Sequence, residues 1–184
     1  MSGVIGDPYP DWLMNINTAL SWKGLTVSGL LDIRKGGDIW NGTNARMNRI
    51  GISEASGERD HTFVIEGVIE QADGSYVAND IEIAPEDYWG DYLGDFGASS
   101  QAIQDGGWVR LREVKLAYTF TLDPKNVIKG LSVSATGRNL WLKTDYLGVD
   151  PETSLTGAGS NISGFDWFNN PGTKSYLFSV SAAF

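Results

Sequence analysis

The chain of 184 residues is long enough for one ordinary domain, and its 41% of hydrophobic residues is normal for a protein that folds. A net charge of -9 argues against a nucleic-acid partner, because contact with a phosphate backbone needs clustered cations. There is no cysteine, and the single histidine, His61, lies in a polar stretch with no G-x-S-x-G nucleophile elbow elsewhere. We therefore expect no enzyme, no catalytic residues, no metal site and no cofactor.

The first residues, 1–12, contain neither a basic region nor an apolar run, so we expect no signal peptide there. No segment approaches the roughly 20 apolar residues of a membrane helix, which excludes a helical membrane protein. Neither argument bears on a membrane β-barrel, whose strands are only alternately apolar.

Five segments alternate apolar and polar residues with the period of two that predicts a β-strand. They are residues 12–22, 25–34, 108–120, 131–142 and 174–184. Lys23-Gly24 joins the first two as a hairpin. The alternation is imperfect in the third segment, where Arg110 and Arg112 share the parity of apolar residues such as Leu116.

These segments predict an all-β fold, an antiparallel up-and-down meander of about five long strands with two long loops. Strands of this length exceed the usual soluble strand of about 5 to 6 residues and match the roughly 9 to 11 that cross a bilayer. Short connections at 23–24 and 121–130 alternate with long ones at 36–107 and 143–173, and aromatic residues gather toward both strand ends. The pattern favours part of a transmembrane β-barrel, and a soluble β-sandwich is the alternative.

The long segment 36–107 is strongly acidic, with 14 of the 23 Asp and Glu residues and only three cations. It contains a predicted small hairpin about Asp73-Gly74. Its aromatic residues suit sugar stacking, although packing of the loop on itself needs the same residues and is favoured. The candidate loop contacts are Trp40, Tyr88, Trp89 and Tyr92. On this reading the alternative function is a stand-alone soluble β module that binds glycan or protein through its aromatic acidic loops.

Several phrases of the chain resemble the C-terminal end of the SusC/RagA-like TonB-dependent outer-membrane transporters. They include SWKGLTVSGLLDIRKGGDIWNGT at 21–43, WVRLREVKLAYTF at 108–120, GRNLWLKTDYLGVDPE at 137–152 and the last strand. The least generic residues form a family motif for which we favour a structural role at the top of a strand. They are Asn139, Leu140, Thr144, Tyr146, Gly148, Asp150, Pro151 and Glu152.

The resemblance implies that residues 1–184 are a fragment of a barrel of about 22 strands closed around a plug. It implies TonB-dependent uptake of an oligosaccharide or a peptide across the outer membrane, with no activity of the fragment alone. The implied partners are the rest of the barrel and plug, a SusD-like surface lipoprotein, the TonB system acting through the plug, and outer-membrane lipid. The last strand resembles the barrel-assembly signal, carried here by Tyr176, Phe178, Val180 and Phe184.

Overall fold

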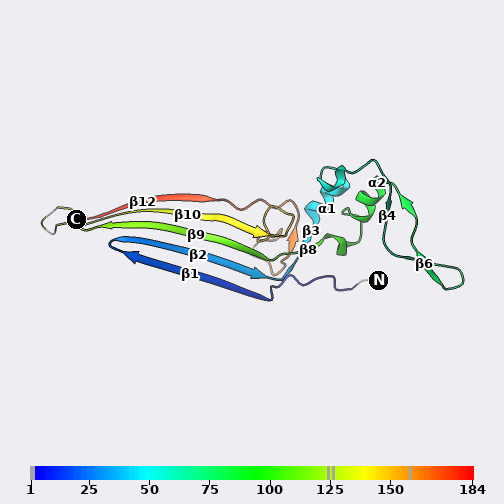
Figure 1. Cartoon of the computed structure of the whole chain (residues 1–184), viewed down its shortest axis with the longest axis horizontal. Coiled ribbons are helices and arrows are strands. Elements are labelled where there is room, and N and C mark those ends of the chain that lie inside the picture. Colours follow the sequence, from blue (N-terminus) through cyan, green and yellow to red (C-terminus); the bar gives the residue numbers. More distant parts are fainter. Residues whose placement is uncertain (1–2, 124, 126, 158) are drawn as a thin grey trace. The chain divides into compact units, whose positions relative to one another are not determined.

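A five-stranded antiparallel sheet dominates the computed structural model, which describes residues 3–123, 125, 127–157 and 159–184. The strands are β1 (Trp12–Trp22), β2 (Leu25–Lys35), β9 (Trp108–Phe120), β10 (Gly130–Thr144) and β12 (Ser175–Ala183). They lie side by side in that order, each antiparallel to the next (Figure 1). The predicted meander is confirmed, with strand ends within two residues of the expected positions. Among the described residues the sheet is open, because β1 pairs only with β2 and β12 only with β10.

The register brings the apolar residues of all five strands onto one face. One cross-strand row runs from Leu20 to Val27, Leu116, Ala135 and Phe178. These side chains are largely uncovered: 74% of Leu20 and 79% of Phe178 is exposed. A period-two pattern builds such a face only when neighbouring strands are paired in phase, because a slip of one residue turns every side chain to the other face.

The chain divides into two compact units. The sheet unit comprises Asp7–Asp38, Asp105–Thr153 and Asn170–Phe184, and it holds the five long strands. The loop unit comprises Ile39–Gln104 and Ser154–Asn169 together with the described residues before Asp7. Most of the acidic segment and part of the second long loop thus fold together.

Short elements make up the loop unit. Its helices are α1 (Gly42–Arg49), the single turn α2 (Pro85–Asp87), the π-helical turn Tyr88–Tyr92, and 3₁₀ turns at Ala55–Gly57 and Ser99–Ala102. A small sheet has the order β11 (Phe165–Asp166), β3 (Asp38–Asn41), β8 (Ile103–Asp105), and β4 (Phe63–Val64) pairs with β7 (Glu82–Ile83). The predicted hairpin about Asp73-Gly74 is present as β5 (Val68–Glu70) and β6 (Tyr76–Ala78). No helix in the described part of the chain has the length and apolar character needed to cross a membrane.

The core of the loop unit is partly polar. Asn41 and Asp166 are each only 1% exposed, at adjacent strand positions of β3 and β11. Asn41 caps α1 by accepting a hydrogen bond from the Asn44 N–H at 2.9 Å, and Thr43 donates to Asp166 at 2.9 Å. The bond from Thr43 to Asp166 joins residues 123 positions apart in the chain, so the two long loops share one polar anchor.

Candidate functional site

The broken alternation in β9 has its origin in a β-bulge. Leu30 of β2 pairs with Glu113, but the next residue, Leu31, pairs with Leu111. Arg112 is therefore the extra residue of β9 at this point. A bulge inserts one residue into a strand and so exchanges the two faces for every residue beyond it.

The exchange places four residues, 108 to 111, on the faces opposite to those that a simple period of two predicts. Val109 pairs with Ile33 and joins the apolar face, while Trp108 and Arg110 lie on the opposite face. Both of these are buried, with 5% and 4% of their surface exposed. In the sequence, Arg110 lies an even number of positions from apolar residues such as Leu116, which would place it on the apolar face. The bulge places it on the opposite face instead.

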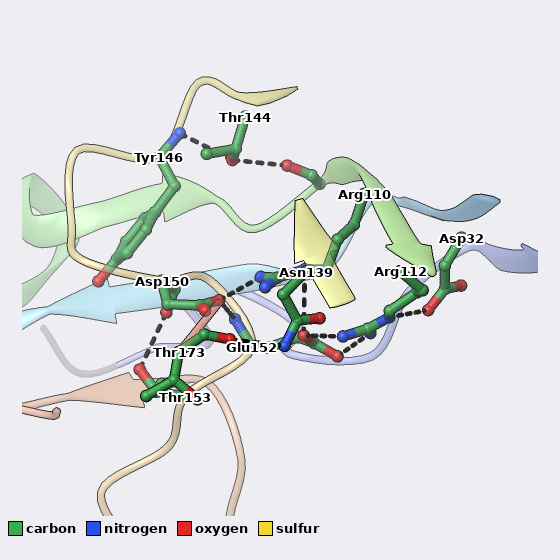
Figure 2. A network of polar contacts seen from close by, with 11 residues as sticks. Asp32, Arg110, Arg112, Asn139, Thr144, Tyr146, Asp150, Glu152, Thr153 and Thr173 are labelled. Carbon is green, nitrogen blue, oxygen red and sulfur yellow. Dashed lines mark hydrogen bonds and ion pairs between the residues drawn. The ribbon is translucent and has the colours of Figure 1, made fainter. Parts of the chain in front are cut away.

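A network of ion pairs surrounds the bulge (Figure 2). Arg110 Nη2 donates to Asp150 Oδ1 at 2.5 Å, and its Nε lies 3.3 Å from Glu152 Oε2 without a hydrogen-bonding alignment. Arg112 binds Glu152 through both terminal nitrogens, with Nη1 to Oε2 at 2.7 Å, and its Nε donates to Asp32 Oδ2 at 2.8 Å. Such two-pronged contacts between arginine and carboxylate are both strong and directional.

Trp108 completes the network from the same strand. Its ring lies 5.5 Å from the guanidinium carbon of Arg110 and 5.0 Å from that of Arg112, within the range of cation–π attraction. The two arginines are thus engaged by three carboxylates and one indole ring. We read the cluster as a lock between β2, β9 and the loop after β10, since its cations already have anionic partners.

The predicted family motif lies around this lock. Asn139 adopts a left-handed φ of 51° inside the irregular pairing between Arg138 and Trp141, and its amide donates to the Thr173 carbonyl at 3.0 Å. Leu140 folds back over Gly137, where an added Cβ would come within 2.8 Å of it. Asn tolerates this backbone conformation better than most residues, which suits a bulge position.

The remaining motif residues shape the loop that carries Asp150. Thr144 donates to the Gly107 carbonyl at 2.8 Å and accepts from the Tyr146 N–H at 3.1 Å. The buried Tyr146 ring covers Gly148, where a Cβ would lie 2.0 Å from it. A β-turn follows, in which the Thr153 N–H donates to the Asp150 carbonyl at 3.2 Å.

Pro151 occupies the second position of that turn, which its fixed φ favours. The Glu152 N–H also donates to Asp150 Oδ1 at 3.0 Å. The geometry therefore supports a structural role for the motif, and the role itself stays a prediction. The partners Asp32, Arg110, Arg112 and Trp108 were missed from the sequence, where the only signal for them was the interrupted alternation.

The predicted assembly-signal residues lie along β12 and just beyond it. Tyr176, Phe178 and Val180 are 68%, 79% and 74% exposed on the apolar face, and Phe184 is 78% exposed. The first three pair with residues of β10: Tyr176 with Gly137, Phe178 with Ala135 and Val180 with Val133. Their role in barrel assembly stays a prediction.

Three of the predicted loop contacts gather in the loop unit. Tyr88 stacks on Phe63 with ring centroids 4.1 Å apart and planes 3° from parallel, and Trp89 and Tyr92 pack around Tyr88 at 5.1 and 5.6 Å. The Trp89 N–H donates to the Glu58 carbonyl at 3.3 Å. All three are half-buried, so the rings pack largely on one another.

Trp40 belongs to a second aromatic cluster. It stacks on Trp167 with centroids 5.9 Å apart and planes 10° from parallel, and Phe165 lies at the same distance. Both clusters have the geometry expected of self-packing, and a ligand role for their rings stays a prediction. Among the residues that the structure describes, no group of three His, Cys, Asp or Glu side chains could hold a metal ion.

Comparisons with known proteins connect this geometry to a transporter family. TonB-dependent receptors P26 and P3 of Formosa agariphila are 27% and 23% identical to this chain over 98% of its length. The RagAB peptide importer superposes with a TM-score of 0.67 in its closed-closed state and 0.62 in its open-open state, at 18% and 17% identity over 98% and 96% of this chain. The chain resembles a segment of SusC/RagA-like TonB-dependent transporters. No protein-family model matches it.

The likeness covers almost all of this chain but little of its relatives. The chain spans 18% and 17% of the two curated receptors, and 18% and 17% of the two superposed importer chains. The solved structures establish the fold, a partial barrel sheet of antiparallel strands. What the whole transporter imports and binds is a separate question.

Proposed function

We propose that this chain forms part of the wall of an outer-membrane transporter that takes up a nutrient, an oligosaccharide or a peptide, by a TonB-dependent mechanism. The observation that carries the proposal is the apolar face of the five-stranded sheet. Its apolar side chains lie in register across five strands of 9 to 15 residues, and many of them are exposed to solvent. Such a face is costly in water and stable against lipid.

The sheet edges support a place within a larger barrel. A strand with no partner presents unpaired N–H and C=O groups, which hydrocarbon does not satisfy. In the proposed transporter β1 and β12 pair with further barrel strands, and a plug inside the barrel couples to the TonB system. The role is transport rather than catalysis.

The loop unit supports an extracellular position at the mouth of the transporter. It follows the ends of β2 and β10 that lie opposite the short turns, and in outer-membrane barrels the long loops are extracellular. We propose that a SusD-like lipoprotein covers this side. The importer that the chain superposes on is itself named as a two-part RagAB assembly.

Light scattering coupled to size-exclusion chromatography tests the membrane part of this proposal. We expect the purified protein to aggregate in plain buffer and to become monodisperse in detergent, because its apolar face then has a cover. A monodisperse monomer without detergent would instead support the soluble β module that binds through its loops.

Uptake measurements test the transport part. Deleting the gene in its native host should abolish growth on the imported nutrient, and growth on a supply of amino acids and glucose is the control. Peptide and oligosaccharide mixtures offered separately distinguish the two substrate classes. Affinity purification from outer membranes should recover a lipoprotein, and its absence would contradict the proposed partner.

A further inference from the structure

A hollow of about 380 Å³ lies on the apolar face of the sheet. It crosses β2, β9, β10 and β12 near the short-turn end. Its walls are mainly apolar side chains: Leu25, Leu116, Tyr118, Val133, Phe178 and Val180. The volume falls within the about 300–1,000 Å³ of ordinary ligand pockets.

A small residue creates the hollow. Ala135 lies in the row between Leu116 and Phe178, where every neighbouring strand presents a larger side chain. Phe178 is 79% exposed and so stands above the sheet beside this gap. The hollow thus has a methyl group in its floor and an aromatic ring at its border, which fits a flexible hydrocarbon chain.

A cation lies in the turn that precedes Leu25, on one side of the hollow. Leu25, one wall of the hollow, pairs with Trp22 of β1. The Lys23 ammonium lies 4.9 Å from the centre of the Trp22 ring, which places this charge beside the apolar face. No lysine of the described residues forms an ion pair within the chain, so the Lys23 charge is available to an outside anion.

The backbone at Lys23 strengthens the case for a role of this side chain. Lys23 and Gly24 form the two-residue turn of the β1–β2 hairpin with φ of 46° and 85°. Turns of this kind favour Asn, Asp or Gly at the first position, because a left-handed φ is strained for a longer side chain. Strained residues of this kind gather at functional sites.

We propose that the hollow is a binding site for one phospholipid, with an acyl chain over Ala135 and the headgroup phosphate at Lys23. This inference rests on the proposed function, because it places the apolar face in a bilayer. Aromatic residues and lysines at the ends of membrane segments lie at headgroup level, where the charge meets lipid phosphate. The short-turn end of the sheet then lies in the leaflet that supplies this lipid.

Native mass spectrometry of the membrane-extracted protein, delipidated in detergent and titrated with phosphatidylglycerol, tests the site. Ala135→Trp fills the hollow and should remove the one-lipid adduct. Val27→Trp adds the same ring to the same row on β2, outside the hollow, and should retain the adduct. Circular dichroism confirms that each variant keeps its strand content.

The headgroup contact has its own pair of variants. Lys23→Gln should weaken phosphatidylglycerol binding about fivefold, the factor that one lysine near anionic lipid contributes. It should leave binding of diacylglycerol, which lacks the phosphate, unchanged. Lys35→Gln removes a lysine from the other end of β2 and should have no effect on either lipid.

Equal lipid retention by Ala135→Trp and Val27→Trp, or equal loss, overturns the site. A dimer that Ala135→Trp abolishes, with lipid unaffected, would show that a second copy occupies the hollow and also overturns it. In each of these outcomes the protein still needs detergent for extraction from membranes, so the proposed membrane location holds while the lipid site fails. Failure of the proposed function gives a different result, because the protein would then be monodisperse without detergent.

Discussion

Asp150 is a buried carboxylate that forms an ion pair with one arginine, Arg110. It is 6% exposed, and its partner Arg110 is 4% exposed. Removing Asp150 leaves the buried Arg110 guanidinium with only its poorly aligned contact to Glu152, and a buried charge that has lost its main partner costs more than the pair itself contributes. The loop after β10 therefore depends on this buried pair more than on the exposed ion pairs.

We predict that Asp150→Ala lowers the free energy of unfolding by about 3–5 kcal/mol, the cost of breaking a buried ion pair. Urea unfolding in detergent, followed by tryptophan fluorescence, measures it. The control is Glu113→Ala, whose partner Arg138 has a side chain that is 60% exposed. That change should cost less than about 1 kcal/mol. Equal losses for the two variants would contradict the lock.

Asp73 is a pH-sensitive residue in the β5–β6 hairpin. The Ser75 hydroxyl donates to Asp73 Oδ1 at 2.6 Å and the Ser75 N–H at 2.9 Å, and these bonds hold the pKa of Asp73 below its ordinary value of 3.8. Hydrogen bonds to the charged form favour that form. The carboxylate thus stabilises the hairpin above pH 3.8, and this contribution is lost as pH falls through the lowered pKa.

An NMR titration checks this prediction. The pKa of Asp73 in the wild type should lie below that in Ser75→Ala, where the first and largest cause, the hydroxyl hydrogen bond, is missing. Thr62→Ala removes a hydroxyl bonded to Glu82 instead and serves as the matched control. A pKa of Asp73 that is unchanged in Ser75→Ala would refute the assignment.

At the scale of the element, the bulge in β9 decides which side chains face outward. Without it, Leu111 would share a face with Glu113, and with it Leu111 lies opposite Leu31 on the apolar face. One inserted residue thus keeps a continuous apolar face on one side and gathers Trp108 and Arg110 on the other.

Single cysteines test this exchange cleanly, because the chain has no cysteine of its own. A spin label at Leu111→Cys should meet lipid-soluble oxygen as readily as one at Leu116→Cys. A label at Ala117→Cys, on the opposite face, should instead meet a water-soluble nickel reagent. If the Leu111→Cys label behaves like the Ala117→Cys label, the bulge does not exchange the faces in the membrane.

At the scale of the whole molecule, the apolar face determines where the sheet is stable. A charge on a lipid-facing strand position costs about 2–4 kcal/mol near the bilayer midplane, whereas positions on the other side of the strand tolerate it. Two adjacent residues of one strand therefore differ sharply in the cost of a charged substitution.

We predict that Phe178→Arg strongly reduces the amount of folded protein in the outer membrane, and that Ser179→Arg has a much smaller effect. Both residues lie on β12, and they face opposite sides of the sheet. Quantitative immunoblotting of outer-membrane fractions measures the difference. Similar losses for both variants would argue against a lipid-facing apolar side.

The sequence by itself determined the five long strands, their order in an antiparallel meander and the residues of the apolar face outside the bulged end of β9. Strand alternation is a local property, since each side chain's face follows from its neighbours two residues away. The hairpin at Asp73-Gly74 was predictable for the same reason, because a turn depends on a few adjacent residues.

Only the tertiary structure decided which residues meet across the chain. The bulge at Arg112 is visible only through the pairing of β9 with β2 and β10, and the contact of Arg110 with Asp150 joins positions 40 residues apart. The separation of Trp40 from the cluster of Tyr88, Trp89 and Tyr92 likewise depends on how the loops fold. Alternation follows from the geometry of a single strand, whereas ion pairs, bulges and ring stacks depend on partners that no local pattern specifies.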